Sequence, residues 1–223
     1  AESRVAADGT RVFALTAQED TTELFPGTPV RTLGFNGSYL GPTLRAERGE
    51  DVRVEVRNEL DETTTVHWHG LRLDNRYDGV PHDTQAPIAP GESFTYRLEF
   101  PDPGLYWYHP HIREDYTQEL GLYGNILVDP VSADAPNPVH HEVPLMLDDV
   151  LTTADGRTAM PHGREAATHA LMGRFGNVLL VNGRTDWSMD VARGAVVRFL
   201  ASDDGGYVTG QTIVCDGGSF MGL

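Results

Sequence analysis

The chain has 223 residues, which is enough for one large or two small domains with a sizeable buried core. Its 17 arginines (lysine is absent) and 33 acidic side chains give a formal net charge of −16, which repels phosphate backbones and anionic lipids. No apolar run approaches the ~18 residues of a membrane-spanning helix. We therefore expect neither a nucleic acid nor a membrane as a partner.

The acidic charge either favours cationic or neutral partners, metal ions among them, or only keeps the protein soluble. The single cysteine, Cys215, excludes an intrachain disulfide and leaves the compartment undecided. A chain that starts at Ala1 rather than at Met fits a processed secreted protein or a trimmed chain.

The first 130 residues read as a series of short strands separated by turns. Residues 51–58 place Val52, Val54 and Val56 on one face and charged side chains on the other, which is the period of a half-buried strand. Together with 24 Gly and 14 Pro, this pattern predicts an all-β Greek-key sandwich. The predicted strands are Arg11–Ala17, Val30–Phe35, Thr43–Glu47, Asp51–Asn58, Glu92–Glu99, Leu105–His111 and Tyr123–Val128.

A proline-rich stretch over residues 131–141 predicts a linker to a second segment, residues 142–199. In that segment we expect strands at Glu142–Asp148, Val178–Val181 and Ala195–Leu200, and a helix at Arg164–Arg174. These strands are too few to close a second sandwich, so the segment is predicted to be an incomplete second domain.

Two histidine pairs stand out, His67-Trp68-His69 and His109-Pro110-His111. On a strand, residues i and i+2 face the same side about 7 Å apart, so two such pairs on neighbouring strands direct four imidazoles at one volume. Imidazole suits copper, zinc, iron and nickel, and the lack of a nearby carboxylate pair or thiolate favours copper or zinc. The alternative is a set of unrelated structural histidines. The other histidines are predicted to be surface or structural residues: His82, His140, His141, His162 and His169.

The residues around these pairs resemble the copper motifs of multicopper oxidases. The resemblance rests on His67-Trp68-His69-Gly70-Leu71, Asp78-Gly79-Val80-Pro81 and Gly104-Leu105-Tyr106-Trp107-Tyr108-His109-Pro110-His111. It extends from about residue 10 to about residue 199, where residues 173–183 resemble the start of the family's second cupredoxin domain. The resemblance implies a cupredoxin-like fold for residues 1–130.

The resemblance also implies roles for individual residues. His67 would bind the type 2 copper, and His69, His109 and His111 would bind the type 3 pair. Asp78 would be an acid behind the ligands that orients water and relays protons, although it is also a good turn residue. The family couples one-electron oxidation of phenols, aromatic amines or metal ions to reduction of dioxygen, outside the cell or in the periplasm.

The sequence departs from the family pattern in two ways. The trinuclear cluster needs eight histidines, and the H-x-x-H-x-H and H-C-H motifs that supply the other four are absent, as are recognisable type 1 copper ligands. Three alternatives follow: a laccase-like oxidase, a copper-binding module without turnover, and a purely structural sandwich. A homo-oligomer is a further possibility, because two copies would bring eight motif histidines together.

The last 24 residues, 200–223, resemble the end of a short-chain dehydrogenase instead. The resemblance rests on residues 200–204, 207–211 and 214–218. The cofactor-binding glycine loop and the Tyr-x-x-x-Lys motif of that family are missing. We interpret the chain as a chimera joined near Phe199, whose tail supplies a strand at Thr212–Cys215 to an open sheet edge.

Overall fold

The computed structural model describes residues 1–37, 39–131, 138–154, 176–202 and 208–214. Its first layer is a five-stranded sheet in which β2 pairs with β1, β3 and β5, and β5 pairs with β7. The β2–β5 pairing is parallel and the other pairings in this sheet are antiparallel. The strands are β1 (Ser3–Val5), β2 (Arg11–Phe25), β3 (Thr28–Phe35), β5 (Asp51–Asn58) and β7 (Ser93–Glu99).

The second layer is a four-stranded sheet in the order β4-β9-β8-β6. Its strands are β4 (Leu44–Glu47), β6 (His67–His69), β8 (Gly104–His109) and β9 (Gly124–Asp129). β4 runs parallel to β9, whereas β8 is antiparallel to both β9 and β6. From β3 to β8 each consecutive strand lies in the other sheet, so the chain crosses repeatedly between the two layers of the sandwich.

The hydrophobic core lies between these two sheets. Val54 and Val56 of β5 are fully buried, and from the opposing sheet Trp68 and Tyr108 are buried completely as well. Burying each such side chain contributes about 1.5–3 kcal/mol. Because side chains alternate along a strand, sending Trp68 into this core turns its neighbours His67 and His69 to the other face of the sheet.

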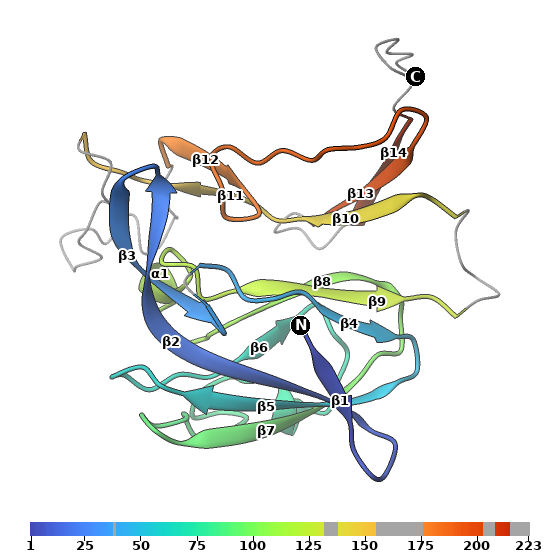
Figure 1. Cartoon of the computed structure of the whole chain (residues 1–223). Coiled ribbons are helices and arrows are strands. Elements are labelled where there is room, and N and C mark those ends of the chain that lie inside the picture. Colours follow the sequence, from blue (N-terminus) through green and yellow to red (C-terminus); the bar gives the residue numbers. More distant parts are fainter. Residues whose placement is uncertain (38, 132–137, 155–175, 203–207, 215–223) are drawn as a thin grey trace.

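The second segment forms two small sheets that lie along the side of the sandwich made by β8 and β9 (Figure 1), and β13 contacts β8. One sheet has the order β10-β13-β14 and the other pairs β11 with β12. Their strands are β10 (His141–Leu145), β11 (Leu147–Val150), β12 (Val178–Val181), β13 (Val196–Ser202) and β14 (Val208–Val214). A 3-10 turn, η1 (Asn75–Tyr77), and a short helix, α1 (Glu114–Thr117), complete the described elements, none of which is a helix long and apolar enough to cross a membrane.

The β2–β3 hairpin joins the two parts of the chain. Leu24 and Val30, near its tip, form a small separate core with Val150 of β11 and Leu180 of β12. The hydroxyl of Thr185 also donates to the Leu24 carbonyl at 2.9 Å. The long hairpin therefore packs the second segment onto the first sheet.

A buried polar cluster strengthens the same junction. The hydroxyl of Tyr39 donates to the carboxylate of Asp148 at 3.0 Å, and Tyr123 donates to the same carboxylate oxygen. Burial raises the pKa of Asp148 above its ordinary value, and the two tyrosine hydrogen bonds act against that rise. The cluster connects residues before β4 and β9 to β11.

The predicted strands of the first 130 residues are found with their ends shifted by one or two residues, except for the end of β2. β2 continues to Phe25, well past the predicted end at Ala17, because its polar second half pairs with β3 instead of entering the main core. The strand predicted to end at His111 ends at His109. Pro110 has no amide hydrogen to continue the ladder.

In the second segment, the single strand predicted at Glu142–Asp148 is wrong. It is divided at Met146 into β10 and β11, which belong to different sheets. The side chain of Asn182 accepts from the Met146 amide at 2.8 Å, and the Asn182 amide donates to the Met146 carbonyl at 2.8 Å, so both backbone groups of Met146 leave the ladder. The helix predicted at Arg164–Arg174 lies outside the described residues.

At the end of the chain, β14 pairs antiparallel with β13 in the register Val196↔Val214 to Ser202↔Val208. A strand on this sheet edge was predicted from Thr212, and β14 begins four residues earlier, at Val208. β14 pairs with the edge of β13 that lies opposite to β10. Cys215, which was placed in that strand, lies outside the described residues.

Candidate metal centre

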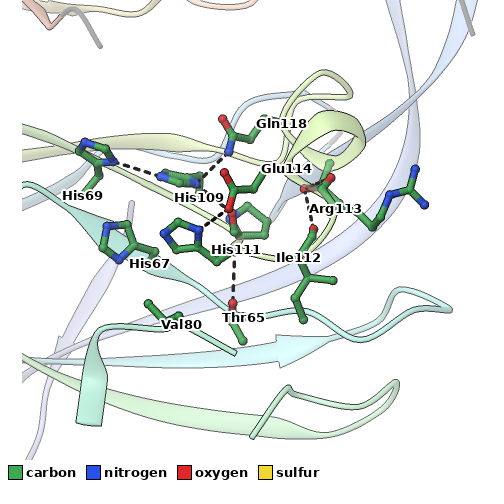
Figure 2. A network of polar contacts seen from close by, with 12 residues as sticks. Thr65, His67, His69, Val80, His109, His111, Ile112, Arg113, Glu114 and Gln118 are labelled. Atoms are coloured by element: carbon green, nitrogen blue, oxygen red, sulfur yellow. Dashed lines mark hydrogen bonds and ion pairs between the residues drawn. The ribbon is translucent and has the colours of Figure 1, made fainter. Parts of the chain in front are cut away.

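Strands β6 and β8 place the candidate ligands directly opposite one another. Their antiparallel register sets His67 against His109 and His69 against Trp107. Since Trp68 and Tyr108 fill the core, His67, His69 and His109 share the other face of the sheet (Figure 2). The predicted neighbouring strands therefore carry His67, His69 and His109, whereas His111 lies just beyond the end of β8.

Three of the four imidazoles form a compact group. One ring nitrogen from each of His67, His109 and His111 lies within 4.8 Å of the others. The ring centroids of His67 and His111 are 4.6 Å apart, and those of His109 and His111 are 5.2 Å apart. The group is half-buried at His67 and His111 and fully buried at His109.

His69 joins this group through His109. Nδ1 of His69 lies 3.3 Å from Nε2 of His109, and the His69 ring centroid is 5.5 Å from those of both His67 and His109. With nitrogen–metal bonds of about 2.0–2.1 Å, two nitrogens that lie 3.3 Å apart subtend an N–metal–N angle close to the tetrahedral angle. The pair therefore has the spacing of two ligands on one ion.

The turn at Asp78 holds His67. The backbone carbonyl of Asp78 lies 2.7 Å from His67 Nδ1, and its carboxylate oxygen lies 3.4 Å from the same atom. Donation from Nδ1–H to the carbonyl leaves Nε2 as the coordinating nitrogen. Gly79 makes this approach possible: at φ +80°, a Cβ added there would lie 2.0 Å from the Val66 carbonyl oxygen.

His109 is held from three sides. Its Nδ1 lies 2.9 Å from the Pro110 carbonyl and 3.0 Å from the amide nitrogen of Gln118, an amide that can turn either its oxygen or its NH2 to the ring. The indole of Trp107 stacks on the ring at 4.0 Å and 24°. Burial is the main cause that lowers the pKa of His109 to about 3, so this ligand is neutral at physiological pH.

His111 lies beyond β8, in the turn that leads to α1. Its amide donates to the Thr65 hydroxyl at 3.3 Å, and its Nδ1 contacts the carboxylate of Glu114 (Figure 2). Glu114 was not predicted as a site residue from the sequence. The signal available was an acid three residues after a candidate ligand, a spacing that brings the two together only if the chain turns there.

All five residues predicted for the site lie close together. His67, His69, His109 and His111 come together, and Asp78 lies directly behind His67. Of the histidines predicted to be structural, His140 accepts from the Val196 amide at 3.0 Å, and His141 begins β10. His162 and His169 lie outside the described residues.

The donor set suits copper. Four imidazoles with carboxylates only behind the rings form a nitrogen-rich site without thiolate, which fits copper or zinc better than magnesium or calcium. The rings of His67 and His111 are partly exposed, so an ion has access to the group. The residues present therefore fit a copper centre.

Comparison with known proteins decides the family. The family model described as "Multicopper oxidase" matches residues 16–133, which hold all four histidines. The chain belongs to the multicopper oxidase family. The cupredoxin-like all-β fold predicted from the sequence is confirmed by a multicopper oxidase crystal structure from Pseudomonas thermotolerans. It has a TM-score of 0.77 and 34% identity, and the match covers 86% of this chain and 46% of that one.

Curated relatives agree. The chain is 31% identical over 194 residues to multicopper oxidase mco of Staphylococcus aureus, a match that covers 85% of this chain and 41% of that protein. It is 40% identical over 130 residues to Laccase-1 of Botryotinia fuckeliana, covering 57% of this chain and 22% of that protein. The chain thus spans less than half the length of these relatives.

Proposed function

We propose that this chain provides the first-domain half of the copper centre of a laccase-like oxidase. The observation that carries this proposal is the convergence of four imidazoles, three of them within 4.8 Å of one another at a ring nitrogen. In this proposal His67 binds the type 2 copper, and His69, His109 and His111 bind the type 3 pair. The 3.3 Å spacing supports His69 and His109 as ligands of one type 3 ion, with His111 on the other.

When bound, the copper ions would supply one-electron chemistry that couples oxidation of a donor to reduction of dioxygen. The protein's own contribution is orientation and proton supply. The Asp78 carbonyl orients the His67 ring, and its partly exposed carboxylate is placed to hold a water and exchange protons near the site. Trp107 covers one face of His109 and excludes water there.

The electron donor and the cellular location are inferred from the family. We infer that the electron donors are phenols, aromatic amines or metal ions, and that the protein works outside the cell or in the periplasm. We also infer the domain division made from the sequence: residues 1–130, the linker 131–141, the segment 142–199 and the tail 200–223.

The chain alone is expected to bind copper with little or no oxidase turnover. Its sequence holds four of the eight histidines of a trinuclear cluster, and no type 1 motif. The alternative function, a copper-binding module without turnover, shares these ligands. A purely structural sandwich, the third alternative, would bind no copper. An oxidase completed by dimerisation, with four histidines from each copy, predicts 1.5 coppers per chain and a dimer in sedimentation.

Copper titration tests the proposal. The wild-type chain is expected to bind copper tightly, and a His67→Ala/His109→Ala variant is expected to lose that binding while His141→Ala, at an exposed position, retains it. Equal binding by all three proteins would contradict the proposal. Crystals soaked with copper and measured by anomalous scattering would place each ion, and robust phenol oxidation under oxygen by the chain alone would contradict the expectation of little or no turnover.

The tail is proposed to be of foreign origin, joined near Phe199. The support is its resemblance to the end of a short-chain dehydrogenase. Amplification of the coding sequence across the codon of Phe199 from genomic DNA tests this origin. Failure to amplify one continuous product would identify an assembly artefact, and a sequence that continues as a multicopper oxidase would overturn the chimera.

A further inference from the structure

His111 differs from the other three candidate ligands in the way that it is held. His67, His69 and His109 lie in β-strands, where ladder hydrogen bonds fix the backbone, whereas His111 follows β8. Outside the strand ladder, its amide donates to the Thr65 hydroxyl at 3.3 Å. As with the other ligands, the orientation of its ring depends on what its Nδ1 contacts.

Helix α1 provides that contact. Arg113, immediately before α1, is in the left-handed conformation at φ 51° and ψ 49°, which reverses the chain direction. Glu114 then begins the helix and contacts His111 Nδ1 (Figure 2). Because the chain turns at Arg113, His111 and Glu114 meet although no helix contains both of them.

The fold fixes the position of α1. Thr117 is buried, and its hydroxyl donates to the carbonyls of Ile112 and Arg113 at 3.2 and 3.1 Å. The Leu122 amide donates to the Thr117 carbonyl at 3.0 Å and ties the helix to the segment before β9. The Glu114 carboxylate is thus presented by an anchored turn, although its side chain is 45% exposed.

The chemistry of the acceptor also differs among the ligands. The nearest acceptor to Nδ1 of His67 and of His109 is a backbone carbonyl, whereas Nδ1 of His111 faces a carboxylate. The Asp78 carboxylate lies farther from His67 Nδ1, at 3.4 Å. A carboxylate accepts hydrogen bonds only, so it favours the tautomer with the proton on Nδ1 and the lone pair on Nε2. It also makes the ring a stronger electron-pair donor than a neutral acceptor does.

We propose that Glu114 is a positioning residue, which holds His111 in the Nδ1–H tautomer with Nε2 directed at the other ligands. The part of this proposal that concerns metal affinity rests on the proposed copper-binding function. The part that concerns the tautomer does not, because it describes the metal-free protein. One measurement therefore tests the tautomer, and a second one tests the metal affinity.

The first readout is long-range ¹H–¹⁵N NMR of the metal-free chain, which reports the tautomer of each histidine. In the wild type, His111 is expected to carry its proton on Nδ1. Glu114→Ala is expected to shift His111 toward the Nε2–H form, and Glu114→Gln, whose amide oxygen can still accept, is expected to restore the Nδ1–H form. Asp115→Asn is the matched control: it removes one negative charge from the same helix, where Asp115 pairs with Arg113.

The second readout is the affinity for Cu²⁺ alone, measured in competition with a chromophoric chelator. Glu114→Ala is expected to weaken binding by about 10- to 100-fold, Glu114→Gln by a smaller factor, and Asp115→Asn by less than about 3-fold. If Glu114→Ala lowers the Tm, Glu114→Gln serves as the affinity test, because it preserves the shape of the side chain while removing its charge. An affinity equal to that of the wild type would then overturn the contribution of the carboxylate.

The outcomes are distinguishable. An unchanged His111 tautomer in Glu114→Ala, or an affinity loss in Asp115→Asn as large as in Glu114→Ala, would overturn the positioning role even if the wild type binds copper. A tautomer shift in Glu114→Ala without copper binding by the wild type would support the positioning role and overturn the proposed function.

Discussion

Tyr123 donates a hydrogen bond from the segment before β9 to the largely buried carboxylate of Asp148 on β11. The two residues connect the sandwich to the second segment through a group that is costly to leave unsatisfied. Tyr123→Phe is therefore expected to lower the free energy of unfolding by about 1–3 kcal/mol, measured by urea denaturation. Tyr116→Phe is the matched control, since the Tyr116 hydroxyl contacts the exposed guanidinium of Arg31, and a change below about 1 kcal/mol is expected there. Equal losses in both variants would contradict a special role for the buried cluster.

The same carboxylate gives the protein a defined pH dependence. The raised pKa of Asp148 means that the folded state binds its proton more tightly than the unfolded chain does. The tighter binding of this proton contributes fully to the free energy of unfolding below the ordinary pKa of 3.8. That contribution is lost as the pH rises through the higher pKa of the folded state. Asp148→Asn is thus expected to gain stability relative to the wild type as the pH rises from 3.8 through the raised pKa of the folded state. Urea midpoints of the two proteins across that range measure the difference, and a constant difference would disprove the assignment.

Gly79 is expected to be indispensable to the turn behind His67. Gly79→Ala places a methyl group 2.0 Å from the Val66 carbonyl oxygen at φ +80°, so the Asp78 turn must move away from His67. We expect a loss of more than about 2 kcal/mol in the free energy of unfolding. Gly91→Ala has the same sign of φ, at +77°, with no atom within 4 Å of the added Cβ, and is expected to cost about 1 kcal/mol. Thermal unfolding of both variants checks the prediction, which fails if they lose equal stability.

His109 is the ligand whose loss should matter most. It contacts His69 Nδ1 at 3.3 Å and belongs to the compact group with His67 and His111. His109→Ala is expected to weaken Cu²⁺ binding by on the order of 100-fold or more, beyond the effect of losing a supporting residue. His140→Ala, at a histidine that contacts the Val196 amide, should leave the affinity within about 3-fold. Calorimetric titration of both variants gives the answer, and an affinity for His109→Ala equal to that of the wild type would refute the site.

The sequence predicted those parts of the fold in which local pattern and tertiary environment agree. The alternating valines of β5 identify a strand because one face of it is buried, and the His67–His69 pair aims at one side for the same reason. The second half of β2 was missed because Gln18–Glu23 is too polar to show a buried face, and its pairing with β3 depends on the hairpin. Glu114 was missed because its contact with His111 requires the left-handed turn at Arg113, which no periodicity encodes.

The strands that carry the histidines bury Trp68 and Tyr108 on one side and present the ligands on the other. Substitutions among the ligands therefore leave the hydrophobic interior intact. A lineage that carries this sandwich is free to lose, alter or regain its metal chemistry while the polypeptide keeps folding, and surviving structure in such a protein is no proof of surviving activity.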